Sequence, residues 1–276
     1  MNPAAVTIRP AASTADYLAC QDAQRRAWGI ADDSYVVPLA TLVGAQMHGG
    51  LVLGAFLADG SAVGLSFAFL GRVEGRLCLY SQLTGIVPGQ QGQGLGLKLK
   101  HAQRDFCRRE GIDRVAWSFD PLQAGNAQFN LGHLGAIAVR YIPDMYGARS
   151  DALNTDAPTD RLIAEWSVAE QSSPQLDPLD ANRADRLIDV FENPDGSLEP
   201  IGTKLPGTSP APALIEIPAD IRALRAADPA RAAAWGRAVR QAFTAAFAAG
   251  RVADGFLRDE SSGRRRCFYV ARLRKA

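Results

Sequence analysis

The chain has 276 residues, which is enough for one large domain or two smaller ones. Its 30 lysine and arginine residues nearly balance its 29 aspartate and glutamate residues, and the formal net charge is +1. A chain with so little net charge has no overall field that draws it to nucleic acid or to an anionic membrane. We therefore expect neither of these partners, and instead a small molecule.

Cysteine usage indicates a reducing compartment. The four cysteines are far apart in the sequence and form no Cys-x-x-Cys pair: Cys20, Cys78, Cys107 and Cys267. We expect reduced thiols that behave as small hydrophobes. The first residues lack the basic and then apolar pattern of a signal peptide, and no apolar run approaches roughly 18 residues. We expect a cytoplasmic protein that is neither secreted nor membrane-spanning.

The first third of the sequence alternates between helix and strand patterns. A short strand at 6–9 precedes a helix that Ser13 can cap, and a second helical stretch covers 37–47. Three strand-like runs follow at 51–57, 62–70 and 76–87. The Asp59-Gly60 and Glu74-Gly75 turns between these runs predict antiparallel hairpins.

A glycine-rich junction follows the third of these strands. The strand ends at Val87, a turn at Pro88-Gly89 follows, and glycines occur at 92, 94 and 96. A predicted helix over 94–109 then carries one apolar face, formed by Leu95, Leu99, Ala102 and Phe106. The first N–H groups of a helix have no intrahelical acceptor and lie at its positive end, and glycine lets an anion approach the backbone. The junction therefore predicts a site for a phosphate-bearing cofactor.

The glycine spacing separates the known kinds of phosphate loop. A dinucleotide-binding loop needs Gly-x-Gly-x-x-Gly and a P-loop needs Gly-Lys-Ser/Thr, and the alternating glycines here fit neither pattern. The run from Val87 to Leu97 instead resembles the acyl-CoA loop of GNAT acetyltransferases, Gln/Arg-x-x-Gly-x-Gly/Ala after a strand that ends at a proline. Gln91, Gly94 and Gly96 occupy the three defining positions. The alternative is an ordinary glycine-rich surface turn.

The resemblance implies an α+β fold, with a central mixed, mostly antiparallel sheet flanked by helices. A strand predicted at 114–119 would splay from the 76–87 strand, and the gap would admit the acyl chain. Asn126 matches the asparagine of a second family motif, which ends at Leu134-Gly135, although Ala136 replaces the usual aromatic residue. The implied co-substrate is acetyl-CoA or another acyl-CoA, held by Ile86, Val87, Gln91, Gly92, Gln93, Gly94, Leu95, Gly96, Leu97 and Asn126.

The resemblance does not carry over a complete catalytic set. Many family members have a tyrosine about one turn before the Leu-Gly, where this sequence offers Asn130 or His133. Tyr146 is a candidate acid, although packing is the commoner role of such a tyrosine. Asp120 is a candidate base, with turn formation before Pro121 or a chain of water molecules as alternatives. His133 is a further acid–base candidate, with a structural role as its alternative.

The remaining charged residues near the loop give weaker signals. Lys98 and Lys100 follow the glycines, and we interpret them either as solvated helix-surface residues or as phosphate contacts. The three histidines, His48, His101 and His133, are isolated and show no ligand spacing. We therefore expect no metal site.

The composition changes after residue 168. We predict a GNAT domain over 1–168, a polar, proline-rich linker over 169–186 and a C-terminal α+β subdomain over 187–276. The predicted elements of the subdomain are a hairpin around Asn193-Pro-Asp-Gly196, a strand at 214–217, a helix from Asp228-Pro229 to Gly250, and strands at 252–257 and 267–273. This order matches the back half of a GNAT unit. We consider a degenerate half-unit that extends the sheet, with an unrelated appendage as the alternative.

Over about 6–168 the sequence is similar to a little-characterised GNAT branch of bacterial predicted acetyltransferases. The resemblance implies an enzyme that moves an acetyl or other short acyl group from acyl-CoA to the amine of a small-molecule acceptor by direct attack. Two alternatives stay open: a non-catalytic acyl-CoA-binding module and a protein N-acetyltransferase. Because GNAT proteins are often dimers, a homodimer is one expected assembly.

Overall fold

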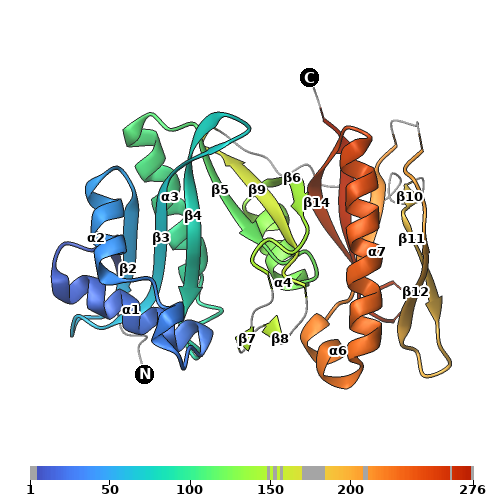
Figure 1. Ribbon diagram of the computed structural model, residues 1–276, viewed down its shortest axis with the longest axis horizontal. Helices are drawn as coiled ribbons and strands as arrows, with labels where there is room; N and C mark the ends of the chain where they lie inside the picture. The colour runs from blue at the N-terminus through green and yellow to red at the C-terminus, as the bar shows by residue number, and fades with distance from the viewer. Residues whose placement is uncertain are drawn as a thin grey trace. The chain divides into compact units, whose positions relative to one another are not determined.

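The computed structural model describes residues 5–147, 150–151, 154–155, 158–169, 184–207, 211–261 and 263–274. The chain divides into two compact units (Figure 1). The first unit comprises Met1–Trp117, Ser150–Thr155 and Ser167–Ala169, and the second comprises Ser118–Arg149, Asp156–Trp166 and Glu170–Ala276. Most of the predicted linker, at 170–183, lies outside the described residues. The predicted domain boundaries stay a prediction.

The first unit is built on five strands in the order β1-β2-β3-β4-β5. Their bounds are β1 (Thr7–Pro10), β2 (Leu51–Phe56), β3 (Ala62–Val73), β4 (Arg76–Ile86) and β5 (Arg114–Phe119), the last of which belongs to this unit as far as Trp117. Neighbouring strands are antiparallel except β4 and β5, which run parallel. A short hairpin, β7 (Ser150–Asp151) with β8 (Asn154–Thr155), also belongs here.

Helices cover both faces of these strands. The helical segments are α1 (Thr14–Trp28), η1 (Asp33–Tyr35), α2 (Leu39–Met47) and α3 (Leu95–Glu110). Leu65 and Phe67 of β3 join the core formed with α1 and α2, whereas Ser66 between them contacts Gln103 of α3. Successive strand residues point to opposite faces, so α3 lies on the face opposite α1 and α2 (Figure 1).

The second unit has its own set of strands, in the order β9-β6-β14-β15-β13-β10. Their bounds are β6 (Ile137–Ile142), β9 (Arg161–Ser167), β10 (Asp185–Arg186), β13 (Ala213–Ile217), β14 (Arg251–Asp259) and β15 (Arg266–Leu273). A separate hairpin joins β11 (Ile188–Glu192) to β12 (Leu198–Thr203). The helical segments are α4 (Ala124–Ala127), a π-helical turn η2 (Gln128–His133), α6 (Ile221–Ala227) and α7 (Pro229–Ala248).

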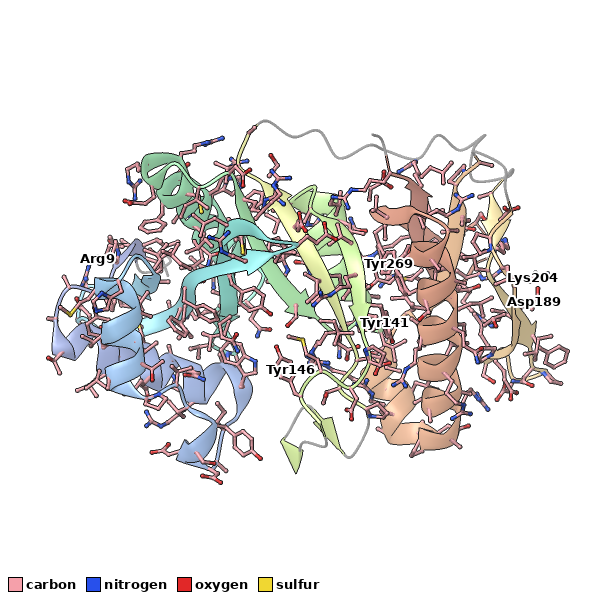
Figure 2. The ribbon with its side chains drawn as sticks, turned by 45° about the horizontal axis from the view of Figure 1, so that its top comes forward. Arg9, Tyr141, Tyr146, Asp189, Lys204 and Tyr269 are labelled. Atoms are coloured by element: carbon pink, nitrogen blue, oxygen red, sulfur yellow. The ribbon has the colours of Figure 1, made fainter. Side chains whose placement is uncertain are left out.

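The core of the second unit forms where α7 packs on these strands. Phe243 of α7 is fully buried and stacks on Tyr141 of β6, and its ring meets Tyr269 of β15 edge-on. Figure 2 labels the two tyrosines of this cluster. Beside the rings, the Asp160 carboxylate accepts hydrogen bonds from the Tyr141 hydroxyl, 2.5 Å away, and from the Arg240 guanidinium. Aromatic packing and this partly buried ion pair therefore hold α7 in place.

The predicted α+β class is confirmed: mixed, mostly antiparallel strands are flanked by helices. The C-terminal elements extend a sheet, because β14 pairs with β6 at Ala253 and Ala138. One element differs from expectation: α6, which Asp220 caps, was not predicted.

All four cysteine thiols are free and buried. None of the helices within the described ranges is long and apolar enough to span a membrane.

Candidate acyl-CoA site

The glycine-rich loop leaves the end of β4 as a closed turn. The Val87 N–H donates to the Val63 carbonyl at 3.0 Å, and the Gln90 N–H donates back to the Val87 carbonyl at 3.0 Å. The Gln91 side chain, which holds the first position of the motif, donates to the Ile86 carbonyl at 3.1 Å. Gln91 therefore fixes the loop against the strand end.

The loop delivers α3 with its first amides uncapped. Gly94 is the N-cap residue, and its φ of +75° is a left-handed conformation that favours glycine. No side chain caps this helix, and its first turn carries no acidic residue. The first intrahelical bond runs from the Lys98 N–H to the Gly94 carbonyl, so the amides of Leu95, Gly96 and Leu97 have no helical acceptor.

This donor set fits a phosphate group. The turn at 92–94 is exposed, a Cβ at Gly92 or Gly94 would meet no atom within 4 Å, and the amides lie at the positive end of α3. An anion could thus reach the backbone without displacing protein atoms. The predicted loop residues Gln91 to Leu97 lie together in the first unit, directly after Ile86 and Val87.

Strands β4 and β5 are paired over a short distance only. Their register pairs join Leu79 with Val115 and Tyr80 with Ala116. Among the described strands, β4 has no partner on this side from Ser81 to Ile86. We call this unpaired edge of β4 the seam. It begins at Ser81, beside Trp117, and runs along β4 to the glycine loop.

A β-bulge and a pocket lie along the same part of β4. Phe67 pairs with Leu83 and Ala68 pairs with Ser81, so Gln82 is an extra residue without a β3 partner. A pocket of about 430 Å³ opens beside it, lined by Val37, Thr41, Ala45, Phe67, Phe69 and Gln82. Gln82 brings its amide group to a lining that is otherwise mainly apolar.

The structure corrects the expectation for Lys100. It is not a solvated surface residue, because only 4% of it is exposed. Its ammonium nitrogen lies 2.9 Å from the Ser81 hydroxyl and 3.8 Å from the centre of the Trp117 ring. Lys100 therefore bridges the first β4 residue and the first β5 residue beyond the strand pairing. Lys98, two residues earlier, is exposed.

The Ser81 partner of Lys100 belongs to a cluster of neutral polar side chains. The Gln103 amide donates to the Ser66 hydroxyl at 2.7 Å and to the Ser81 hydroxyl at 3.0 Å, and Thr84 lies 2.8 Å from Ser66. Among the described residues, no carboxylate forms an ion pair with Lys100. Burial therefore lowers the pKa of Lys100 to about 7. The side-chain oxygen of Gln103 is buried without a hydrogen-bond partner.

Sequence reasoning missed this cluster because the helix face was placed slightly wrongly. The expected apolar face included Ala102 and Phe106, but both are only partly buried, whereas Gln103 and Cys107 are fully buried. The spacing of residues 95, 99, 103 and 107 is an equally regular helical stripe. If residues 95, 99, 103 and 107 are taken as the buried stripe, Lys100 lies beside it.

The predicted catalytic residues lie in the second unit, where two of them have structural partners. Asp120 accepts the Leu122 N–H at 2.8 Å and forms an ion pair with Arg225 at 3.3 Å. The Tyr146 hydroxyl lies 2.9 Å from the Ser118 hydroxyl. These contacts match the turn-forming and packing alternatives considered for both residues.

His133 and Asn126 are exposed residues of η2 and α4. The His133 ring packs edge-on against Phe129. Within the described residues, no three histidine, cysteine, aspartate or glutamate side chains gather as metal ligands would.

No family model and no curated protein matches the chain, but solved structures do. yncA from Salmonella typhimurium, solved with its cofactor acetyl-CoA, is 22% identical, with a TM-score of 0.46 over 63% of this chain and 99% of that one. A protein from Desulfovibrio desulfuricans assigned to the GNAT family is 20% identical (TM-score 0.45; 60% and 100% covered). The ribosomal-protein-S18-alanine N-acetyltransferase from Escherichia coli is 17% identical (TM-score 0.45; 63% and 100% covered). The matched structures include GNAT-family N-acetyltransferases.

Proposed function

We propose that the protein transfers a short acyl group from acyl-CoA to the amine of a small molecule. The observation that carries the proposal is the junction of β4, the glycine loop and α3. The uncapped amides at the start of α3 follow directly after β4, and from Ser81 onward the side of β4 that faces β5 has no partner among the described strands. One feature suits a pyrophosphate and the other suits an extended chain that ends in an acyl group.

Each part of the junction has a separate task. The amides of Leu95 to Leu97 would hold phosphate oxygens, and the free edge of β4 would hold the extended arm. The co-substrate supplies an acyl thioester, whose carbonyl carbon is open to attack by an amine. At the Gln82 bulge, backbone groups released from the β3 ladder could donate to negative charge that develops on the carbonyl oxygen.

The pocket beside Gln82 supports a small acceptor. Its volume of about 430 Å³ lies within the range of small-molecule sites. Phe67 and Phe69 would contact an apolar body, and Gln82 offers one polar contact. Attack requires a neutral amine held near the thioester, so positioning would supply most of the rate enhancement.

A second candidate function is acyl-CoA binding without turnover. It is favoured by the engagement of Asp120 with Arg225 and of Tyr146 with Ser118, because these contacts occupy the two groups predicted as base and acid. Acyl-CoA binding with no acylated product across a broad panel of amines would support this reading.

Titration of acetyl-CoA and of free CoA into Gly94→Asp and Gly94→Asn variants tests the shared cofactor site. Both new residues tolerate a left-handed conformation, and they have the same shape. Only the aspartate adds a negative charge beside the uncapped amides. We expect the Gly94→Asp variant to bind at least about tenfold more weakly than the Gly94→Asn variant, because like charges repel at short range.

Isothermal titration calorimetry at low and high salt gives the measurement, with circular dichroism as the folding control. The difference between the two variants should shrink at high salt. If the wild type binds neither compound, the glycine loop is only a turn and the proposed function fails. Equal affinities for the two variants would place the phosphate groups elsewhere.

A further inference from the structure

Lys100 is a buried amine, and no carboxylate of the described residues forms an ion pair with it. Its ammonium group contacts Ser81 and Trp117, and desolvation is the cause of its lowered pKa. An isolated buried amine lowers the stability of the fold, and an apolar side chain at this position would give a more stable protein. Violations of this kind concentrate at functional sites. The residue therefore needs an explanation beyond packing.

The position of the Lys100 amine suggests that it contacts the acyl group of the co-substrate. Strand pairing stops at Tyr80 and Ala116, and Lys100 contacts the next residue of each strand, Ser81 and Trp117. The amine thus lies at the closed end of the seam. An acyl group that enters the seam from the glycine loop would approach this end with its carbon chain.

A second group at the closed end also lacks a partner. The side-chain oxygen of Gln103 is fully buried and unbonded, although the amide nitrogen of the same side chain donates to two hydroxyl groups. Lys100 uses one hydrogen bond, to Ser81, and one ring contact, whereas an ammonium group can donate three hydrogen bonds. The closed end of the seam therefore has hydrogen-bonding groups that are not in use, and the methyl group of an acetyl chain could not bond to them.

We propose that Lys100 and Gln103 form a specificity site for acyl groups that end in a carboxylate, such as malonyl. A terminal carboxylate would provide the missing counter-charge for Lys100 and would accept its free N–H bonds. Charge-assisted hydrogen bonds of this kind are among the strongest in proteins. This inference rests on the proposed function, because it requires acyl-CoA to bind along the seam.

Calorimetric titration of malonyl-CoA and isovaleryl-CoA tests the site without any acceptor amine. The two acyl groups have nearly the same shape, but isovaleryl carries two methyl groups in place of the carboxylate oxygens. We expect wild type to bind malonyl-CoA at least about tenfold more tightly. In the Lys100→Met variant this preference should disappear, while the affinity for acetyl-CoA changes less than about threefold. The Lys98→Met variant, two residues away on the exposed side of α3, should keep the wild-type preference for malonyl-CoA over isovaleryl-CoA.

The apo protein gives an independent readout. Removing an unpaired buried amine should raise the melting temperature of the Lys100→Met variant by about 2–4 °C, the reverse of what loss of a structural residue would do. If that variant does not fold, Gln103→Glu replaces it, since an internal carboxylate beside Lys100 should also remove the malonyl preference.

The outcomes separate this inference from the proposed function. If acetyl-CoA binds but wild type does not prefer malonyl-CoA over isovaleryl-CoA, the specificity site is wrong and the acyl-CoA site stands. A malonyl preference that persists in both Lys100→Met and Gln103→Glu would also overturn it. If no CoA compound binds to wild type, the proposed function itself fails.

Discussion

The Phe243→Ala substitution should lower the free energy of unfolding of the second unit by about 3–5 kcal/mol. Phe243 is fully buried and contacts three other rings, Tyr141, Phe247 and Tyr269. Its removal would lose the transfer free energy of a phenyl ring and leave a cavity between α7, β6 and β15.

Urea denaturation monitored by circular dichroism measures this effect. The control is Phe247→Ala, one turn later on α7, where the ring is only partly buried. It removes the same atoms from a more exposed position and should cost less than half as much. Equal losses for the two variants would mean that the unit relaxes around Phe243 and that the aromatic cluster is not its core.

The Asp160→Asn substitution should cost about 2–4 kcal/mol at neutral pH. The Asp160 carboxylate is mostly buried and accepts bonds from Arg240, from the Tyr141 hydroxyl and from the Asp144 N–H. Asparagine keeps the shape but leaves the Arg240 cation without its partner, and breaking a buried pair is costly. The Arg240 side chain is 38% exposed, so solvent screening keeps the loss below that of a fully buried pair.

The pH dependence of this loss follows from the pKa of Asp160. Burial alone would raise that pKa, but the hydrogen bonds from Arg240, Tyr141 and Asp144 outweigh burial and hold it below the usual value. A carboxylate with a lowered pKa stabilises the folded state above the pKa of the unfolded chain, and this contribution is lost as the pH falls through the folded value. The gap between wild type and Asp160→Asn should therefore be largest near pH 7 and shrink below about pH 4.

Urea titrations of both proteins between pH 7 and pH 3 measure that gap. Asp105→Asn on α3 is the matched control, because Asp105 forms an exposed pair with Arg108. Surface pairs of this kind contribute little, so this variant should stay within about 0.5 kcal/mol of wild type at each pH. A gap for Asp160→Asn that is constant across the range would show that ionisation of Asp160 does not stabilise the fold.

Local signals predicted much of the fold correctly. The Asp59-Gly60 turn lies between β2 and β3, and Asp228 with Pro229 starts α7 as cap and first residue. These features are encoded within a few residues, so the sequence shows them directly. The seven-residue helix α6 has too few residues for a periodic pattern. It was missed for that reason, although Asp220 caps it with two hydrogen bonds.

One part of the candidate site could also be predicted from local sequence, and the other part could not. The loop from Gln91 to Leu97 could be predicted because its glycines and its helix start are contiguous. The Lys100 cluster could not, because Ser66, Ser81, Lys100 and Trp117 come from four different elements and meet only in the folded chain. A lysine in an amphipathic helix is most often solvated, and only the β4–β5 geometry shows that this one is enclosed.

The short β4–β5 pairing also bears on aggregation. Among the described strands, β4 is an interior strand at Leu79 and Tyr80 but an edge strand from Ser81 to Ile86, and exposed edges can recruit strands from other molecules and start aggregation. This edge is six residues long, contains the Gln82 bulge and is followed closely by Pro88, which has no N–H to extend a ladder. These features resemble the devices that protect natural sheet edges. They would discourage fibril-like pairing between copies while leaving the edge free for the proposed ligand.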